Sequence, residues 1–282
     1  MSRMEFPSWV AGHLTGGIGN RLFQHAAAAG LAEKWETPLV FYLPDCSPTN
    51  HGPFENIFNL FPSVPRITKE VSIERLPEPK QGTFIYTPFP EKPTSSYVTI
   101  DGWRQTELYF PKQGLFPDFE AALTKEKCQF LLKDYDLDTD EKRRATWFLH
   151  VRLGDYKILP HHQIDIHDYY TKAVKHIPEG ARVFLFSDDI EPFGIFLQGF
   201  LRQMGIDPLL IPLKDELETL YVMSQCWGGA IVANSTFSWW GAYFAKKYTP
   251  YPYTAVYPGV WGRGLPPAKD IVPSWGIRIE NK

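Results

Sequence analysis

Residues 146–156 read TWFLHVRLGDY, an apolar run that ends in charged side chains. The part from Trp147 to Val151 has the length and the aromatic and β-branched content of a buried strand. Successive side chains of a strand point to opposite faces, so His150 and Arg152 share one face. The stretch therefore predicts a buried strand that carries a histidine and an arginine to one edge of a sheet.

The residues after this strand alternate between helical and strand patterns. Helices are predicted over 168–177, 190–204, 216–226 and 237–246, and strands over 183–186, 209–211 and 229–232. An alternation of this kind is typical of a parallel sheet with helices on both faces. We therefore expect the second half of the chain to be a doubly wound α/β domain.

The first half begins with a strand, a glycine turn and a helix. An apolar run over 9–14 leads into Gly16-Gly17-Ile18-Gly19, and a helical period continues to Leu31. Further strands are expected over 38–42 and 97–101. Prolines are dense from Pro38 to Pro93, which favours loops there.

A helix is predicted over 118–135, and a polar stretch over 134–144 ends its pattern. Its apolar face is expected to hold Phe119, Leu123, Phe130 and Leu131. We place the domain boundary near residue 140. The expected architecture is two Rossmann-like domains that face each other, 1–140 and 141–282.

Composition excludes several classes of protein. The 282 residues hold 29 Lys and Arg against 32 Asp and Glu, so no broad basic surface indicates a nucleic-acid partner. Cys46, Cys128 and Cys226 are far apart, which fits no disulfide framework or zinc site and indicates a reducing compartment. No stretch approaches the ~18 apolar residues that span a bilayer. We expect a cytoplasmic protein without a transmembrane segment, and the oligomeric state stays open.

Ligands of open α/β sheets bind beyond the carboxyl ends of the strands, so the residues after each strand are candidate sites. The first is Gly16-Gly17-Ile18-Gly19-Asn20-Arg21, where backbone N–H groups and a helix start suit a phosphate or a sugar hydroxyl. As a dinucleotide fingerprint it is incomplete, because Leu22 stands where the third glycine belongs. A dinucleotide-dependent oxidoreductase is thus disfavoured, and a tight structural turn is an equal alternative.

The second candidate site follows the strand that ends near Val151. The guanidinium of Arg152 is able to bind a diphosphate through two hydrogen bonds and to neutralise the charge of a leaving diphosphate. The alternative is a structural ion pair between Arg152 and Asp155, with His150 packed in the interior.

Two further strand ends carry small polar or acidic residues. At Asn234-Ser235-Thr236, the hydroxyl groups either cap the next helix or, with its N–H groups, bind phosphate. Asp188 and Asp189 would bind a metal, a ribose or a base edge, or would cap a helix. His161, His162 and His167 lie close in the sequence, but no carboxylate spacing completes a site. We expect no bound metal.

Three motifs together resemble those of the α-1,2-fucosyltransferase family, the inverting enzymes that use GDP-L-fucose. The family's G-G-x-G-N-Q-x-F-Q-Y-A-A-A is matched by Gly16, Gly17, Gly19, Asn20, Phe23, Gln24, Ala26, Ala27 and Ala28. Its H-x-R-R-G-D-Y is matched by His150, Arg152, Gly154, Asp155 and Tyr156. Its N-S-S-F-S-W-W-G-A is matched by Asn234, Ser235, Phe237, Ser238, Trp239, Trp240, Gly241 and Ala242. The segments 101–110, 169–173, 186–189 and 257–275 also resemble the family in order, so the likeness covers nearly the whole chain.

The resemblance implies a GT-B-type fold of two Rossmann-like domains, with the nucleotide sugar held mainly by the C-terminal domain and the glycan acceptor by the N-terminal one. It implies transfer of L-fucose from GDP-L-fucose, without a cofactor or essential metal, to a hydroxyl expected to be O-2 of galactose. Arg152 would stabilise the departing GDP, Asn20 would lie near the reacting sugar, and Asp155 is the nearest acidic candidate for a general base. The implied substrate-binding residues are Gly17, Gly19, Gln24, His150, Asp188, Asp189, Asn234, Ser235, Thr236, Phe237 and Ser238.

The chain departs from the family pattern at three positions. Leu153 stands where the family has a second arginine, Arg21 where it has glutamine, and Arg104 displaces an aromatic residue. A lost arginine commonly removes ~1 to 3 kcal/mol of charged hydrogen bonding. A transferase of another GDP-sugar and a non-catalytic GDP-sugar-binding protein are therefore the alternatives. Our hypothesis is that Arg21 compensates from the facing domain.

Overall fold

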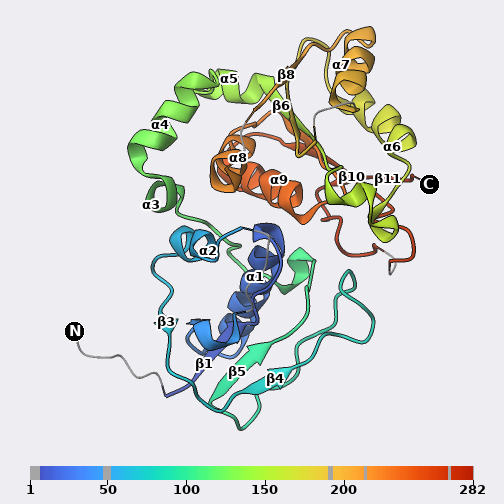
Figure 1. Ribbon diagram of the computed structural model, residues 1–282. Coiled ribbons are helices and arrows are strands. Elements are labelled where there is room, and N and C mark those ends of the chain that lie inside the picture. Colours follow the sequence, from blue (N-terminus) through green and yellow to red (C-terminus); the bar gives the residue numbers. More distant parts are fainter. Residues whose placement is uncertain (1–6, 47–51, 190–192, 213–214, 266–267, 282) are drawn as a thin grey trace. The chain divides into compact units, whose positions relative to one another are not determined.

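The computed structural model describes residues 7–46, 52–189, 193–212, 215–265 and 268–281 (Figure 1). The chain forms two compact units, Met1–Ala121 with Lys269–Ile271, and Ala122–Ala268 with Val272–Lys282. The division precedes the boundary that we expected near residue 140. Helix α4 (Lys125–Asp134) belongs to the second unit, where Lys127 Nζ lies 2.7 Å from Glu218 Oε1 of α8 (Glu216–Ser224).

The first unit is built on short parallel strands. Its sheet has the order β1-β5-β4, formed by Trp9–Gly12, Tyr97–Ile100 and Glu74–Leu76. A parallel pair of β2 (Phe41–Tyr42) and β3 (Arg66–Ile67) lies beside it, linked by the Val10–Leu39 bridge. Helix α1 (Ile18–Lys34) packs through alanine and leucine side chains against Val10, Val98 and Ile100. The unit also contains α2 (Glu55–Leu60) and the 3₁₀ turns η1 (Leu43–Asp45) and η2 (Glu107–Tyr109).

The second unit has the strand order of a Rossmann sheet. Within the described residues, six parallel strands run in the order β11-β10-β9-β6-β7-β8. Their bounds are Thr146–Val151 for β6, Arg182–Ser187 for β7, Pro208–Leu210 for β8, Gly229–Ile231 for β9, Thr254–Pro258 for β10 and Ile277–Ile279 for β11. Counted from β6 along the chain, this is the order 3-2-1-4-5-6, which reverses direction between β6 and β9.

Helices cover both faces of this sheet (Figure 1). Helices α6 (Ile166–Ala173) and α7 (Phe193–Gln203) share a core with Leu149, Val183 and Ile231. Helices α8 and α9 (Thr236–Tyr248) lie on the other side of the sheet. The α/β class with two parallel-sheet units is confirmed.

The helix predicted over 118–135 is divided at Thr124. This residue has φ 71°, and its hydroxyl accepts a hydrogen bond from Lys127 N, so α3 (Phe119–Leu123) ends and α4 begins. The new start rotates the buried face to Cys128 and Leu131, while Phe130 is 58% exposed. The placement of Phe130 on the buried face was therefore wrong.

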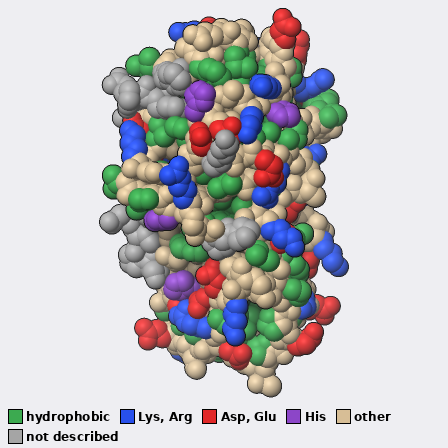
Figure 2. Space-filling model, turned by 90° about the vertical axis from the view of Figure 1, so that its right-hand side faces the viewer, with side chains coloured by type: hydrophobic (Ala, Val, Ile, Leu, Met, Phe, Trp, Pro, Cys, Tyr) green, Lys and Arg blue, Asp and Glu red, His purple; other side chains and the backbone are tan. Residues whose placement is uncertain are grey.

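Other boundaries differ from the predictions at the ends of elements. Strand β1 ends at Gly12, and the polar stretch before β6 contains α5 (Asp140–Ala145). Strands β10 and β11 were not predicted, and residues 190–192 of the helix expected from 190 lie outside the described part. Among the described residues, no helix is both long and apolar enough to cross a membrane. On the face shown in Figure 2, basic and acidic side chains are interspersed.

Candidate functional site

The ends of β6 and β9 form the reversal point of the second unit's sheet. The two strands pair in parallel, with Trp147 opposite Gly229 and Leu149 opposite Ile231. Their carboxyl ends therefore lie at the same edge, and ligands of such sheets bind at this crevice. The edge carries His150 and Arg152 after β6, and the 234–238 segment after β9.

Arg152 is held by two carboxylates. Its Nη2 donates to Asp155 Oδ1 at 2.7 Å, and its Nη1 lies 2.9 Å from Asp188 Oδ2. All three side chains are partly exposed, so the guanidinium is fixed in direction and still open to solvent. The ion pair between Arg152 and Asp155, which we considered as the structural alternative, is present. It holds the Arg152 side chain at the reversal point.

Asp188 also shapes the loop that carries Arg152. Its Oδ1 accepts a hydrogen bond from Leu153 N at 2.8 Å, and a Cβ at Gly154 would overlap Asp188 Oδ2. The Leu153 side chain packs into the core beneath the loop. The position where the family has a second arginine is therefore an apolar contact in this chain.

His150 is buried beside Arg152 and only 5% exposed. Burial, together with the positive charge of Arg152, lowers the pKa of His150 to about 3, so the ring is neutral. Its carbonyl accepts from Tyr170 Oη at 2.7 Å, and its ring lies 6.1 Å from that of Phe237. Among the described residues, no group hydrogen-bonds to Nδ1 of His150. A buried ring nitrogen without a partner is unusual in a folded protein, which makes His150 Nδ1 a candidate for a ligand contact.

Asn234 and Ser238 build the loop between β9 and α9. The Asn234 amide donates to the carbonyls of His162 at 2.7 Å and Trp261 at 3.0 Å. The fully buried Ser238 hydroxyl accepts from Ala233 N and donates to Ser235 O. Both predicted site residues thus position the backbone of the loop.

Ser235, Thr236 and Phe237 form the start of α9. Ser235 occupies the N-cap position, but its side chain makes no capping hydrogen bond to the helix. Thr236 and Phe237 are half-buried in the first turn. Because the N–H groups of a first turn point outward and the helix dipole is positive there, this end suits an anion.

Asp189 is set apart from Arg152. Its carboxylate pairs with Lys157 Nζ, and its backbone N–H donates to Ser187 Oγ at 3.2 Å. The structure thus gives the two neighbouring acids different partners: Asp188 binds the arginine loop, and Asp189 binds the lysine of η3 (Asp155–Lys157).

The glycine turn lies in the first unit, at the carboxyl end of β1. Gly16 has φ 75°, a conformation that favours glycine, and Gly17 is the N-cap of α1. Gln24 is buried, and its Oε1 accepts from Thr15 N at 2.9 Å, so it holds the turn. Asn20 is half-buried, and its Oδ1 accepts from Gln105 Nε2 at 2.9 Å. Gly19 is buried inside the first turn of α1.

The structure gives Arg21 an internal role. Its side chain is fully buried, donates to the carbonyls of Gly52 and Pro53, and lies 4.0 Å over the ring of Phe54. These contacts argue against Arg21 as the replacement for the missing arginine.

Arg104 is likewise internal. It donates to the carbonyls of Asp101 and Pro77, and its guanidinium lies over the rings of Phe89 and Tyr109. The planar guanidinium thus stacks where the family has an aromatic ring.

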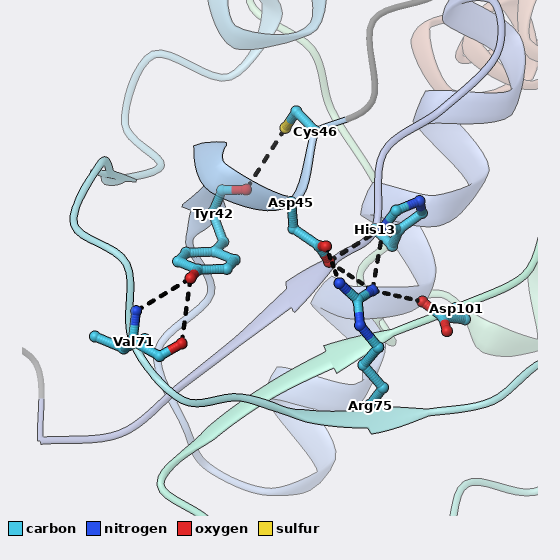
Figure 3. A network of polar contacts seen from close by, with 7 residues as sticks. All are labelled: His13, Tyr42, Asp45, Cys46, Val71, Arg75 and Asp101. Atoms are coloured by element: carbon cyan, nitrogen blue, oxygen red, sulfur yellow. Dashed lines mark hydrogen bonds and ion pairs between the residues drawn. The ribbon is translucent and has the colours of Figure 1, made fainter.

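Our sequence reasoning missed a charged cluster at the carboxyl edge of the first unit's sheet. It consists of His13, Asp45, Arg75 and Asp101, which we call the edge cluster (Figure 3). Arg75 pairs with both Asp45 and Asp101, and His13 Nδ1 lies 3.1 Å from Asp45 Oδ2. The available signal was the position of each residue at or just after a strand, but β4 lies in the proline-dense stretch that we interpreted as loop.

The three histidines that lie close in the sequence, His161, His162 and His167, are not grouped with acidic side chains as a metal site in the part of the chain that the structure describes. The rings of His161 and His162 are 4.3 Å apart, and His162 stacks on Tyr156 at 4.5 Å. His167 packs against Phe200. Among the described residues, no three His, Cys, Asp or Glu side chains are grouped as metal ligands.

Comparison with known proteins finds two relatives among bacterial glycosyltransferases. The chain is 29% identical over 320 residues to the O-antigen biosynthesis glycosyltransferase WbnK of Escherichia coli, covering 93% of this chain and 98% of that protein. It is 25% identical over 283 residues to an alpha-1,2-colitosyltransferase of Escherichia coli, covering 86% and 89%. No protein-family model matches the chain. The homology to glycosyltransferases therefore extends along most of its length.

Solved structures are more distantly similar. The fucosyltransferase NodZ from Bradyrhizobium aligns with 83% of this chain and 92% of its own, at 16% identity and a TM-score of 0.49.

Proposed function

We propose that this chain, a homologue of Escherichia coli glycosyltransferases, is an inverting transferase that moves L-fucose or a close relative of it from the GDP-activated sugar to a glycan hydroxyl. The expected acceptor hydroxyl is O-2 of galactose. One observation carries the proposal: the reversal point of a Rossmann sheet places Arg152, the neutral His150 and the start of α9 at one edge.

The diphosphate is assigned to Arg152 and the start of α9. The guanidinium presents a planar fork of N–H donors, and the helix start adds backbone N–H groups and a partial positive charge. Asp155 and Asp188 hold the guanidinium in place through one terminal nitrogen each, so its direction is set before the donor arrives. This is the arrangement that stabilises negative charge as it grows on a leaving group.

The nucleoside is assigned to the neighbourhood of His150 and Phe237. The neutral imidazole offers Nδ1 as a hydrogen-bonding atom, and the half-buried Phe237 ring offers an apolar face. Asp188 and Asp189 supply carboxylates for a ribose or a guanine edge, although both already hold cations of the loop.

The reaction separates charge within the donor. The bond between the anomeric carbon and the diphosphate breaks, positive charge grows on the sugar ring, and negative charge grows on the departing GDP. Arg152 acts as the electrophile for the diphosphate. The glycan acceptor and Asn20 are assigned to the first unit, at the glycine turn after β1.

The test is release of GDP from GDP-L-fucose with and without galactose-terminated oligosaccharides, for the wild type and for Arg152→Ala and Arg152→Lys. We expect acceptor-dependent release in the wild type. Lysine keeps the charge and loses the fork, so Arg152→Lys should retain a small part of the activity and Arg152→Ala essentially none. GDP binding without turnover on any acceptor would favour the binding-protein alternative.

Donor identity is tested separately, because one relative is a colitosyltransferase. GDP-L-fucose and GDP-colitose should be compared under the same conditions with the same acceptors. A higher kcat/KM for GDP-colitose would retain the transferase and change its donor. Turnover with neither donor, with GDP still bound, would refute the fucose-type assignment.

A further inference from the structure

The edge cluster is a second polar site, at the carboxyl edge of the first unit's sheet. His13 follows β1, Asp45 ends η1, Arg75 lies in β4 and Asp101 follows β5. Register brings them together, because β1 and β4 both pair with β5, with Gly12 and Leu76 opposite Ile100. These residues are far apart in the sequence and meet only at this edge.

Asp45 fixes the orientation of the His13 ring. Its side chain is 6% exposed, and its Oδ2 lies 3.1 Å from His13 Nδ1 and accepts from Arg75 Nη1 at 3.0 Å. The segment is further held by Tyr42, whose hydroxyl donates to Val71 O and accepts from Val71 N (Figure 3). In the tautomer whose Nδ1–H donates to Asp45 Oδ2, the lone pair of the ring lies on Nε2.

The other ring nitrogen of His13 is available. Figure 3 shows it on the side of the ring away from Asp45 and Arg75. The His13 side chain is 25% exposed, and among the described residues no hydrogen bond to Nε2 is formed. A ligand at this edge therefore meets an oriented imidazole nitrogen.

The edge cluster combines two carboxylates and one guanidinium with His13. Arg75 Nη1 also lies 3.2 Å from His13 Nδ1. The same nitrogen donates to Asp45 and to Asp101. Glu78, which accepts from Trp103 N beside Asp101, is the next acid along this edge.

We propose that His13 is the general base of the transfer, with Asp45 as its positioning residue; this inference rests on the proposed function. Nε2 takes the proton of the acceptor hydroxyl, whose oxygen forms the new bond to the anomeric carbon. The bond from that carbon to the β-phosphate oxygen breaks, and GDP leaves with the electron pair. The proton then passes from His13 to water.

Asp155, the acid that we first considered for this role, is committed elsewhere. Its carboxylate accepts from Arg152 Nη2 at 2.7 Å and therefore serves the cation expected to meet the diphosphate. His13 contacts Asp45 and Arg75 instead. It lies on the unit to which the acceptor is assigned.

The decisive variants are His13→Asn and His13→Ala. Asparagine keeps a donor near the Nδ1 position, and thus the contact to Asp45, but has no basic nitrogen. We expect kcat for transfer to fall by about 100-fold or more, the range that positioned bases contribute. The Kd for GDP should stay within about twofold of the wild type. Added imidazole should restore part of the activity of His13→Ala, which a purely structural role would not permit.

Asp45→Asn tests the positioning residue. The variant removes the carboxylate that orients the ring and keeps the basic nitrogen, so kcat should fall, but less than in His13→Asn, while the KM for the donor should stay within about twofold of the wild type. Transfer by His13→Asn within about threefold of the wild type, with an unchanged pH profile, would overturn the inference. If His13→Asn folds poorly, the imidazole experiment on His13→Ala decides, and lack of rescue counts against the proposal. Absence of transfer by the wild type would refute the proposed function instead.

Discussion

Arg152 Nη1 lies 2.9 Å from Asp188 Oδ2, and the other oxygen of the same carboxylate accepts from Leu153 N. One side chain at the end of β7 therefore fixes both the arginine and the backbone that follows it. This coupling explains how the loop keeps the guanidinium directed at the edge where a diphosphate is expected.

Asp188 contributes an oxygen that accepts a hydrogen bond from the backbone N–H of Leu153, and a negative charge beside Arg152. Two variants separate these contributions. Asp188→Ala removes both, so Arg152 loses one partner and the loop loses an anchor. We expect GDP binding to weaken about tenfold, or ~1.4 kcal/mol. Asp188→Asn keeps an oxygen for Leu153 N but replaces the acceptor for Arg152 Nη1 by an NH2 donor, so its affinity for GDP should fall, but by less than in Asp188→Ala. Calorimetric titration with GDP measures both; equal weakening in the two variants would contradict this division.

Gly154→Ala tests the close approach of the loop to Asp188. A Cβ at this position would overlap the carboxylate, so the side chain must move and Arg152 with it. We expect at least tenfold weaker binding of GDP. The matched control is Gly199→Ala in α7, where no atom lies within 4 Å of the added Cβ. That change should leave GDP binding unaltered and stabilise the helix by ~1 kcal/mol. Unaltered GDP affinity in Gly154→Ala would show that the loop relaxes without moving Arg152.

Sequence reasoning predicted the second unit better than the first for a physical reason. Strands such as β6 and β7 are buried on both faces and read as continuous apolar runs, separated by helices of clear period. Strands β10 and β11 follow no such alternation, and the segment between them is rich in proline and glycine.

The candidate site was predicted where its residues are adjacent in the sequence. His150 and Arg152 share a strand end, and Ser235 and Phe237 share a helix start. The edge cluster escaped prediction because its contacts join residues 13, 45, 75 and 101 through the register of short strands. Roles were also harder to predict than positions: Arg21 lies at the expected turn but is directed into the unit, where carbonyl groups bind it.

Arg21→Gln separates the compensation hypothesis from the structural role. Glutamine is too short to reach both Gly52 O and Pro53 O and cannot stack as a cation on Phe54. We expect the variant to lose ~2 kcal/mol of stability, as for a charged hydrogen bond removed from the interior. The KM for the donor should stay within about twofold. Urea unfolding and steady-state kinetics measure the two quantities, and a raised donor KM with unchanged stability would restore the original hypothesis.

Two buried histidines should make both units sensitive to acid. Burial lowers the pKa of His25 from 6.5 to about 3, and that of His150 to about 3. The unfolded chain therefore binds protons between pH 6.5 and pH 3 that the folded chain excludes, so stability falls as the pH decreases through this window. Each histidine should cost its unit ~2 kcal/mol between pH 7 and pH 5.

His25→Phe isolates the contribution of the first unit. The ring of His25 lies 4.7 Å from that of Phe41 and 4.5 Å from that of Phe61, and its buried Nε2 has no hydrogen-bond partner among the described residues. Phenylalanine keeps the ring contacts and cannot be protonated. We expect the variant to be at least as stable as the wild type at pH 7 and to lose ~2 kcal/mol less than it on transfer to pH 5. Urea unfolding at the two pH values measures the difference, with the exposed His176→Phe as the control that should follow the wild type. An equal loss in His25→Phe and the wild type would show that the acid sensitivity of the first unit arises from other groups.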